Sequence, residues 1–173
     1  MSTPASILSL HDAAKPLLDF YQRGGVAPPE LLPIDGADMP EPFRKLLVHA
    51  DDMTPTLEHF HGSRIHLRMV NREVTEAAYT REVILEAGEG NQPGEFGAIA
   101  IHLEQFPEAA RELILGESVP LGTILADHTI LHQSCPQAYF RVNSDPLITE
   151  ALGLPDSTEL YGRCNIHRNL NGN

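Results

Sequence analysis

YTREVIL, residues 79–85, alternates in the way that a β-strand requires. Successive side chains of a strand point to opposite faces, so Arg81 shares its face with Tyr79, Val83 and Leu85. An unpaired buried charge costs several kcal/mol, and an arginine cannot escape that cost by losing its proton. The partner of Arg81 is therefore a carboxylate. It belongs either to a glutamate on a neighbouring strand or to a bound ligand, which the guanidinium can grip with two hydrogen bonds.

The segments around this strand predict an antiparallel sheet. Strands are expected in one sheet at 64–72, 79–87, 95–103, 138–143 and 159–168. The Gly/Pro-rich stretch AGEGNQPGE, residues 87–95, indicates a hairpin loop. Helices are expected at 42–52, 53–62, 107–115, 120–128 and 146–153. Hairpin connections with inserted helices, and no alternating βαβ series, indicate the α+β class.

The N-terminal part of the chain, residues 1–45, is rich in proline. A helix is expected over 7–23, with a possible interruption at Pro16 and an end at Gly24-Gly25. An irregular connection follows over 27–42. The length of 173 residues suits one domain with a real core, so we predict a single domain over 1–173.

Composition excludes several classes of partner. Twelve basic and 24 acidic residues give a formal net charge of −12, which disfavours nucleic-acid binding. A small anionic molecule remains possible if the few arginines gather at its site. No apolar run approaches the ~18 residues of a membrane span. Both a monomer and a homodimer are compatible with the sequence.

The N-terminus and the cysteines predict a cytoplasmic protein. No basic region precedes the short apolar run near the N-terminus, so no signal peptide is expected. Cys135 and Cys164 could form one disulfide at most, and that is not the framework of a secreted domain. Cys164 alternates with apolar residues and is predicted to be a buried free thiol.

Histidine spacing does not predict a metal site. His59 and His61 flank a phenylalanine, and His128 and His132 are four residues apart. A zincin helix needs glutamate directly after the first histidine, whereas residues 128–132 read HTILH, and no third ligand is signalled. The acidic pair at 51–52 precedes a predicted helix and is explained by the helix dipole.

Four segments carry a resemblance to a known family. They are DDMT (51–54), TREVIL (80–85), VPLG (119–122) and LYGR (160–163). In their order and spacing they are similar to the chorismate lyase family (chorismate–pyruvate lyase, 4-hydroxybenzoate synthase). The pattern most resembles the family's branch of chorismate-lyase-like bacterial proteins.

The resemblance implies a fold and a site. The fold is a single antiparallel sheet of about six strands, with helices over one face enclosing a ligand cavity. Arg81 takes the place of the family's carboxylate-binding arginine, and Met53 and Leu121 those of two residues whose backbone N–H groups contact the ligand. The family also uses a glutamate on a further strand, after a turn that matches Asn171-Gly172. The sequence ends at Asn173, so that glutamate is not assigned.

The activity that the resemblance implies is elimination of pyruvate from chorismate to give 4-hydroxybenzoate. The reaction forms an aromatic ring, so the protein mainly has to orient the substrate and help one proton to move. No metal or organic cofactor is required. Two alternatives remain open: a non-catalytic protein or inactive relative that binds a small aromatic acid, and a cavity that serves another hydroxy- or enol-acid.

Overall fold

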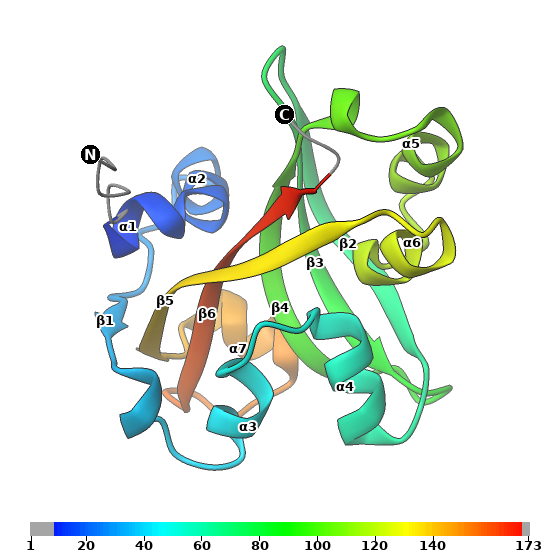
Figure 1. Ribbon diagram of the computed structural model, residues 1–173. Coiled ribbons are helices and arrows are strands. Elements are labelled where there is room, and N and C mark those ends of the chain that lie inside the picture. The colour runs from blue at the N-terminus through cyan, green and yellow to red at the C-terminus, as the bar shows by residue number, and fades with distance from the viewer. Residues whose placement is uncertain (1–8, 171–173) are drawn as a thin grey trace, which may run out of the picture.

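The computed structural model describes residues 9–170 (Figure 1). The predicted turn at Asn171-Gly172 and the first residues of the predicted helix 7–23 lie outside this range. None of the helices within the range has the length and apolar composition needed to cross a bilayer.

The strands form two antiparallel sheets. One has the order β2-β3-β4 and the other β1-β5-β6. The bounds are β1 Leu32–Pro33, β2 Ile65–Val74, β3 Tyr79–Ala87, β4 Gln92–Ile101, β5 His132–Asn143 and β6 Glu159–Asn169. The α+β class and the antiparallel pairing are therefore confirmed.

The expectation of a single sheet of about six strands is wrong. The segment expected to be an irregular connection contains β1, and β1 pairs with β5 through Leu32↔Arg141 and Pro33↔Phe140. Backbone hydrogen bonds along this edge of β5 are thus taken by β1. At these residues β5 cannot pair with β4 along the same edge. The described strands form two sheets of three strands each.

The helices lie within the predicted segments, but the helix predicted over 42–52 is shorter and ends at Leu47. Their bounds are α1 Leu10–Ala13, α2 Lys15–Arg23, α3 Phe43–Leu47, α4 Met53–His61, α5 Glu108–Leu115, α6 Leu121–Asp127 and α7 Pro146–Leu152. Gly62 ends α4 in the left-handed conformation, with φ 62°. The Asp145 side chain accepts a hydrogen bond from the backbone N–H of Ile148 and so caps α7. The break predicted near Pro16 separates α1 from α2.

One face of the β2-β3-β4 sheet, which carries Arg81, is covered by α4, α5 and α6. Two apolar clusters pack there. The Tyr79 cluster joins β3 and β4 to α5 and α6, and comprises Tyr79, Ile101, Ala110, Ile114 and Ile124. The Leu85 cluster joins β2 and β3 to α4, and comprises Leu57, Ile65, Leu85 and Ala87. Arg81 and Val83 therefore lie on the strand between two apolar clusters.

The opposite face of the same sheet is also covered, so the expectation of helices over one face is wrong. Glu82 is 3% exposed on this face, and the strand alternation places it opposite Arg81. Helices α2 and α7 pack against β4. Tyr21 of α2 lies near both Glu82 and Asp145, which with burial raise the pKa of its hydroxyl. Coverage of both faces explains why β3 is buried along almost its whole length, charged residues included.

The β5-β6 pair crosses in front of the other sheet in the view of Figure 1. Gly162, from LYGR, pairs with Phe140, and a Cβ on Gly162 would lie 2.1 Å from that ring. Only glycine therefore lets the ring lie across β6. Strand β5 begins earlier than predicted because the ladder continues past an irregularity between Pro136 and Ala138. Cys164 is a buried free thiol, as predicted.

Candidate functional site

Arg81 is among the most deeply buried side chains of the described residues, with 1% of its surface exposed. Its Nη1 lies 3.5 Å from the carbonyl oxygen of Ile114, at the limit of a hydrogen bond. Its Nε has no hydrogen-bond partner within residues 9–170, and in that range the guanidinium takes part in no ion pair. A buried cation with this little compensation is rare in a folded protein.

Glu117 is the carboxylate that acts electrostatically on Arg81, but it forms its ion pair with Arg72. Its carboxylate lies 2.6 Å from Nη1 of Arg72 and accepts a hydrogen bond of 2.9 Å from the Tyr79 hydroxyl. Burial lowers the pKa of Arg81, while the Tyr79 hydroxyl and Glu117 act in the opposite direction. The glutamate ion pair that the sequence left open for Arg81 is thus not formed among the described residues.

Met53 and Leu121 lie on either side of the Arg81 region. Met53 packs against the Leu85 cluster, and Leu121 packs against the Tyr79 cluster. The starts of their helices touch, because a Cβ on Gly122 would lie 2.7 Å from the Thr54 hydroxyl oxygen. Two segments that are far apart in the sequence therefore meet over the face of the sheet that carries Arg81.

The backbone at both positions is suited to hydrogen bonding. Met53 is the first residue of α4, and Leu121 is the first residue of α6. The first N–H groups of a helix have no partner within the helix, and neither helix has a side-chain cap. Two backbone donors at the starts of these helices consequently lie beside the apolar clusters, and their contact with a ligand stays a prediction.

Glu95 is a site residue that the sequence reasoning missed. In the β3–β4 register Glu95 pairs with Leu85 and Gly97 pairs with Val83, so both lie on the face that carries Arg81. The Glu95 Oε2 atom is buried and has no hydrogen-bond partner in the described part of the chain. Burial raises the pKa of Glu95, and Arg163 opposes this rise. The signal in the sequence was a glutamate at the start of a predicted strand of small and apolar residues, where a charged side chain is unusual.

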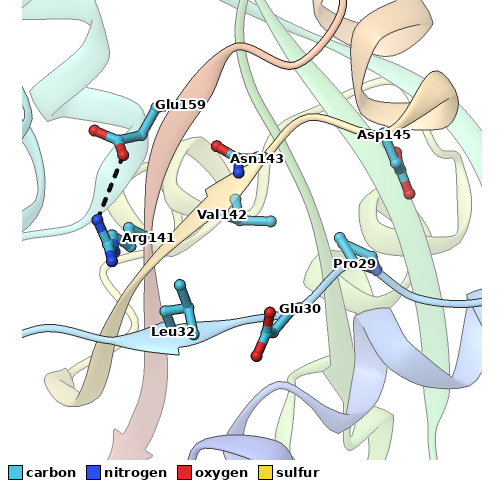
Figure 2. Close-up of a pocket in the computed structure, with 8 residues that line it drawn as sticks. All are labelled: Pro29, Glu30, Leu32, Arg141, Val142, Asn143, Asp145 and Glu159. Carbon is cyan, nitrogen blue, oxygen red and sulfur yellow. Dashed lines mark ion pairs between the residues drawn. The ribbon is translucent and has the colours of Figure 1, made fainter.

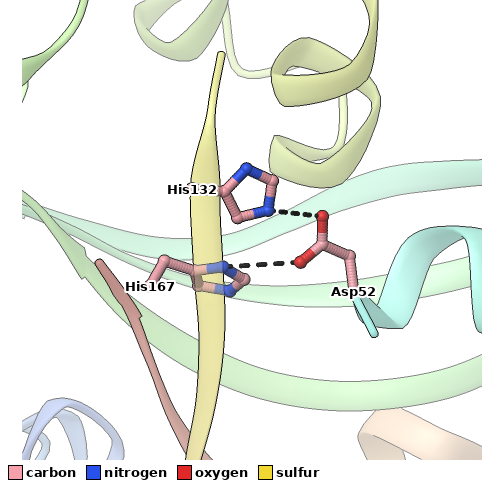
Figure 3. A group of neighbouring side chains, drawn as sticks. All are labelled: Asp52, His132 and His167. Atoms are coloured by element: carbon pink, nitrogen blue, oxygen red, sulfur yellow. Dashed lines mark hydrogen bonds and ion pairs between the residues drawn. The ribbon is translucent and has the colours of Figure 1, made fainter. Parts of the chain in front are cut away.

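A second polar cluster lies where α4 begins. Asp52 is 2.8 Å from Nε2 of His132 and 3.5 Å from Nδ1 of His167 (Figure 3). Burial lowers the pKa of His167, and Asp52 acts in the opposite direction. His128, which the sequence paired with His132, follows α6 and is not part of this group.

Two surface pockets are lined by residues other than Arg81, Met53 and Leu121. A pocket of about 290 Å³ lies between β1, β5 and β6 (Figure 2), and its ion pair joins Arg141 to Glu159 at 3.6 Å. Its lining also holds Glu30 and Asp145, so its acidic excess disfavours an anion. The other pocket, of about 720 Å³, lies beside α3 and α4 and includes Asp52.

Comparisons of the chain with models of known protein families and with curated proteins gave no match. The function therefore has to be inferred from the residues of the site.

Proposed function

We propose that the chain binds a small cyclic acid at Arg81 and acts as a chorismate–pyruvate lyase. The observation that carries the proposal is the burial of the Arg81 guanidinium without an ion-pair partner among residues 9–170. A bound carboxylate would supply the missing charge and accept two hydrogen bonds. The alternative of a structural ion pair leaves the free Nε atom of Arg81 unexplained.

The surroundings of Arg81 suit a ring with a carboxylate at one end. Apolar clusters lie on both sides of Arg81 along β3, and Gly97 carries no side chain on the same face. The ring would lie against this apolar surface, and the N–H groups of Met53 and Leu121 would bind its polar substituents. A few directed polar contacts in an apolar setting are typical of sites for small molecules.

The proposed reaction breaks two bonds of chorismate. The ring carbon that bears the hydroxyl group loses a proton, and the C–O bond between the neighbouring carbon and the enolpyruvyl group breaks. The released electron pair forms the last double bond of the aromatic ring. The enolpyruvate takes up one proton at its methylene carbon and becomes pyruvate. Arg81 orients the substrate through its ring carboxylate, and no redox partner or metal is needed for this balance.

Glu95 is the group that we propose for the proton transfer. Its carboxyl lies on the same face of the sheet as Arg81, and burial raises its pKa. A carboxyl with a raised pKa can hold and release a proton nearer to neutral pH than an exposed glutamate can. This assignment concerns residues 9–170 and is independent of the family's glutamate, which was not assigned.

The direct test is incubation of the purified protein with chorismate. Chromatography should detect 4-hydroxybenzoate and pyruvate in equal amounts, faster than in a control without protein. Arg81→Leu should abolish turnover, and Glu95→Gln should lower kcat more than it raises KM. Binding of 4-hydroxybenzoate without any turnover would favour the alternative of a non-catalytic binding protein. Absence of both binding and turnover would refute the proposal.

A further inference from the structure

Asp52, His132 and His167 bring three potential metal ligands together from three segments (Figure 3). Asp52 precedes α4, His132 is the first residue of β5, and His167 lies in β6. One atom of each residue lies within 4.8 Å of the other two. The side chains are 17%, 18% and 28% exposed, so they are largely shielded without being sealed from solvent.

His132 is oriented as a metal-binding histidine is. Its Nδ1 lies 2.9 Å from the carbonyl oxygen of Ile130, which can only accept a hydrogen bond, so Nδ1 carries a proton. Its Nε2 faces the Asp52 carboxylate at 2.8 Å, which is a second acceptor. Both nitrogens therefore face acceptors, and a neutral ring cannot satisfy both. Either Nε2 is also protonated or it donates its lone pair to a cation, with Ile130 fixing the tautomer.

His167 also presents a nitrogen toward Asp52. Its Nδ1 is 3.5 Å from Asp52 Oδ1, yet both atoms lack a hydrogen bond to any residue in the described range. Its Nε2 lies 3.3 Å from the amide nitrogen of Asn165, which also donates a hydrogen bond of 2.9 Å to the Ser134 hydroxyl, while the Asn165 oxygen has no partner in the described range. A half-turn of that carboxamide places its oxygen against Nε2. His167 would then be protonated at Nε2 and present the Nδ1 lone pair to Asp52.

The three side chains could hold a small cation after rotation of the carboxylate and the imidazole rings. Metal–ligand distances of about 2.0–2.1 Å place tetrahedral ligands about 3.3 Å apart. The 3.5 Å separation between His167 Nδ1 and Asp52 Oδ1 already matches this spacing. The 2.8 Å contact joins Nε2 of His132 to the other carboxylate oxygen, Oδ2. One ligand atom of each residue lies within 4.8 Å of the other two, so side-chain rotations have to draw these three atoms closer around the ion.

The charge around the cluster permits a cation. Arg163 is the positive group that faces it, but Arg163 is held by the backbone carbonyls of His49 and Asp51, at 2.9 and 3.2 Å. The carboxylates of Asp51 and Glu95 also act on Arg163. A divalent ion would bind the Asp52 carboxylate directly. Its repulsion from Arg163 would be reduced, because backbone carbonyls and the carboxylates of Asp51 and Glu95 already act on that guanidinium.

We propose that Asp52, His132 and His167 bind one divalent transition-metal ion of the type of Zn²⁺. Two imidazole nitrogens and one carboxylate favour such an ion over Mg²⁺ or Ca²⁺, which prefer oxygen ligands. A three-residue set leaves at least one position for solvent or a further ligand, and Asp52 also lines the pocket of about 720 Å³. The ion would fix the start of α4, and the proposed lyase reaction does not need it.

The test is metal titration of the full chain after treatment with a chelator. Calorimetry with Zn²⁺ should give one ion per chain, and Co²⁺ should give visible absorption bands of a low-symmetry nitrogen and oxygen site. Thermal melts should show a rise in Tm with Zn²⁺. His132→Gln and His167→Gln should each lose the bound ion and the Tm shift, while retaining the circular dichroism of the metal-free wild type.

Two matched variants control for binding elsewhere. His66→Gln changes an exposed histidine on β2, and His59→Gln changes an exposed histidine of the neighbouring pocket. Both should bind Zn²⁺ as the wild type does. If either cluster variant fails to fold, the other and Asp52→Asn decide the result by the same titration. The proposal is overturned if the wild type binds no ion, if the cluster variants keep it, or if His59→Gln alone loses it. None of these results depends on chorismate.

Discussion

Arg72 and Arg81 pair directly in the register of β2 and β3, but only Arg72 forms an ion pair within the described residues. Arg72 is exposed and has the Glu117 carboxylate 2.6 Å from its Nη1. Arg81 is 1% exposed and forms no ion pair with any described residue. Glu117 contacts Arg72 and the Tyr79 hydroxyl, so it forms no ion pair with the buried guanidinium of Arg81, to which we propose that a ligand carboxylate binds. This relationship underlies the first prediction.

Arg81→Leu is expected to leave the ligand-free protein about as stable as the wild type, within about 1 kcal/mol, or more stable. Replacing a buried charge by an apolar side chain is often neutral or stabilising when no partner is stranded. Chemical denaturation without ligand measures the difference. A loss of about 3–5 kcal/mol would mean instead that the substitution strands a carboxylate, and would restore the structural ion pair.

Gly122→Ala is expected to destabilise the protein by about 0.5–2 kcal/mol, although alanine favours helix by about 0.5–1 kcal/mol over glycine. The new Cβ would lie 2.7 Å from Thr54 Oγ1 and 2.9 Å from Thr54 Cβ, and Thr54 is buried. The starts of α4 and α6 would be forced apart, so binding of 4-hydroxybenzoate should weaken as well.

The matched control for this glycine is Gly90→Ala, in the β3–β4 hairpin. A Cβ there would meet nothing within 4 Å, and the backbone is not left-handed. Urea unfolding should change by less than about 0.5 kcal/mol. Equal effects of the two substitutions would contradict the close contact between α4 and α6.

Glu82→Gln is expected to stabilise the protein at neutral and alkaline pH. Burial raises the pKa of Glu82 in the folded state, with Arg23 opposing it. The folded state therefore holds the proton more tightly than the unfolded state, and stability is lost as the pH rises from the unfolded to the folded pKa. Glutamine removes this loss. Its advantage should become small near about pH 4, where the carboxyl is mostly protonated in both states.

Thermal melts at about pH 4 and about pH 8 would measure the effect of Glu82→Gln. Glu76→Gln, at an exposed position, is the control and should show little dependence of this kind. A Glu82→Gln variant that is less stable than the wild type at alkaline pH would show that the ionised carboxylate has a favourable partner.

Under the proposed lyase activity, the product should inhibit at concentrations no higher than the KM for chorismate. 4-Hydroxybenzoate keeps the carboxylate that Arg81 would bind, and enclosure of its ring would slow its release. Steady-state rates at increasing product concentration give the inhibition constant. An inhibition constant far above KM would argue against an enclosed site that grips the ring carboxylate.

Much of the fold could be predicted from local patterns. Strand β3 occupies residues 79–87 as expected, and the ends of α4 and α7 follow from Gly62, Asp145 and Pro146. The separation into two sheets could not be predicted. One of the two sheets contains the strand Leu32–Pro33, and two residues are too few to produce a periodic pattern in the sequence.

The site was only partly visible in the sequence. Arg81 could be singled out because a charged residue alternated with apolar ones on one strand. Glu95 could not be linked to it, because the register that pairs Glu95 with Leu85 is a tertiary feature. The Asp52 cluster was missed for the same reason, since its three ligands are brought together by the fold and not by spacing.

The most direct test of the central claim, that Arg81 binds a ligand carboxylate, compares two compounds that differ only at that group. Calorimetry should show that wild type binds 4-hydroxybenzoate more tightly than the neutral 4-hydroxybenzamide by about 1.5–3 kcal/mol, roughly 10–150-fold. In Arg81→Leu the two affinities should become nearly equal, and Arg81→Lys should lie between. A preference for the acid that survives in Arg81→Leu, or no binding of either compound to wild type, would contradict the claim.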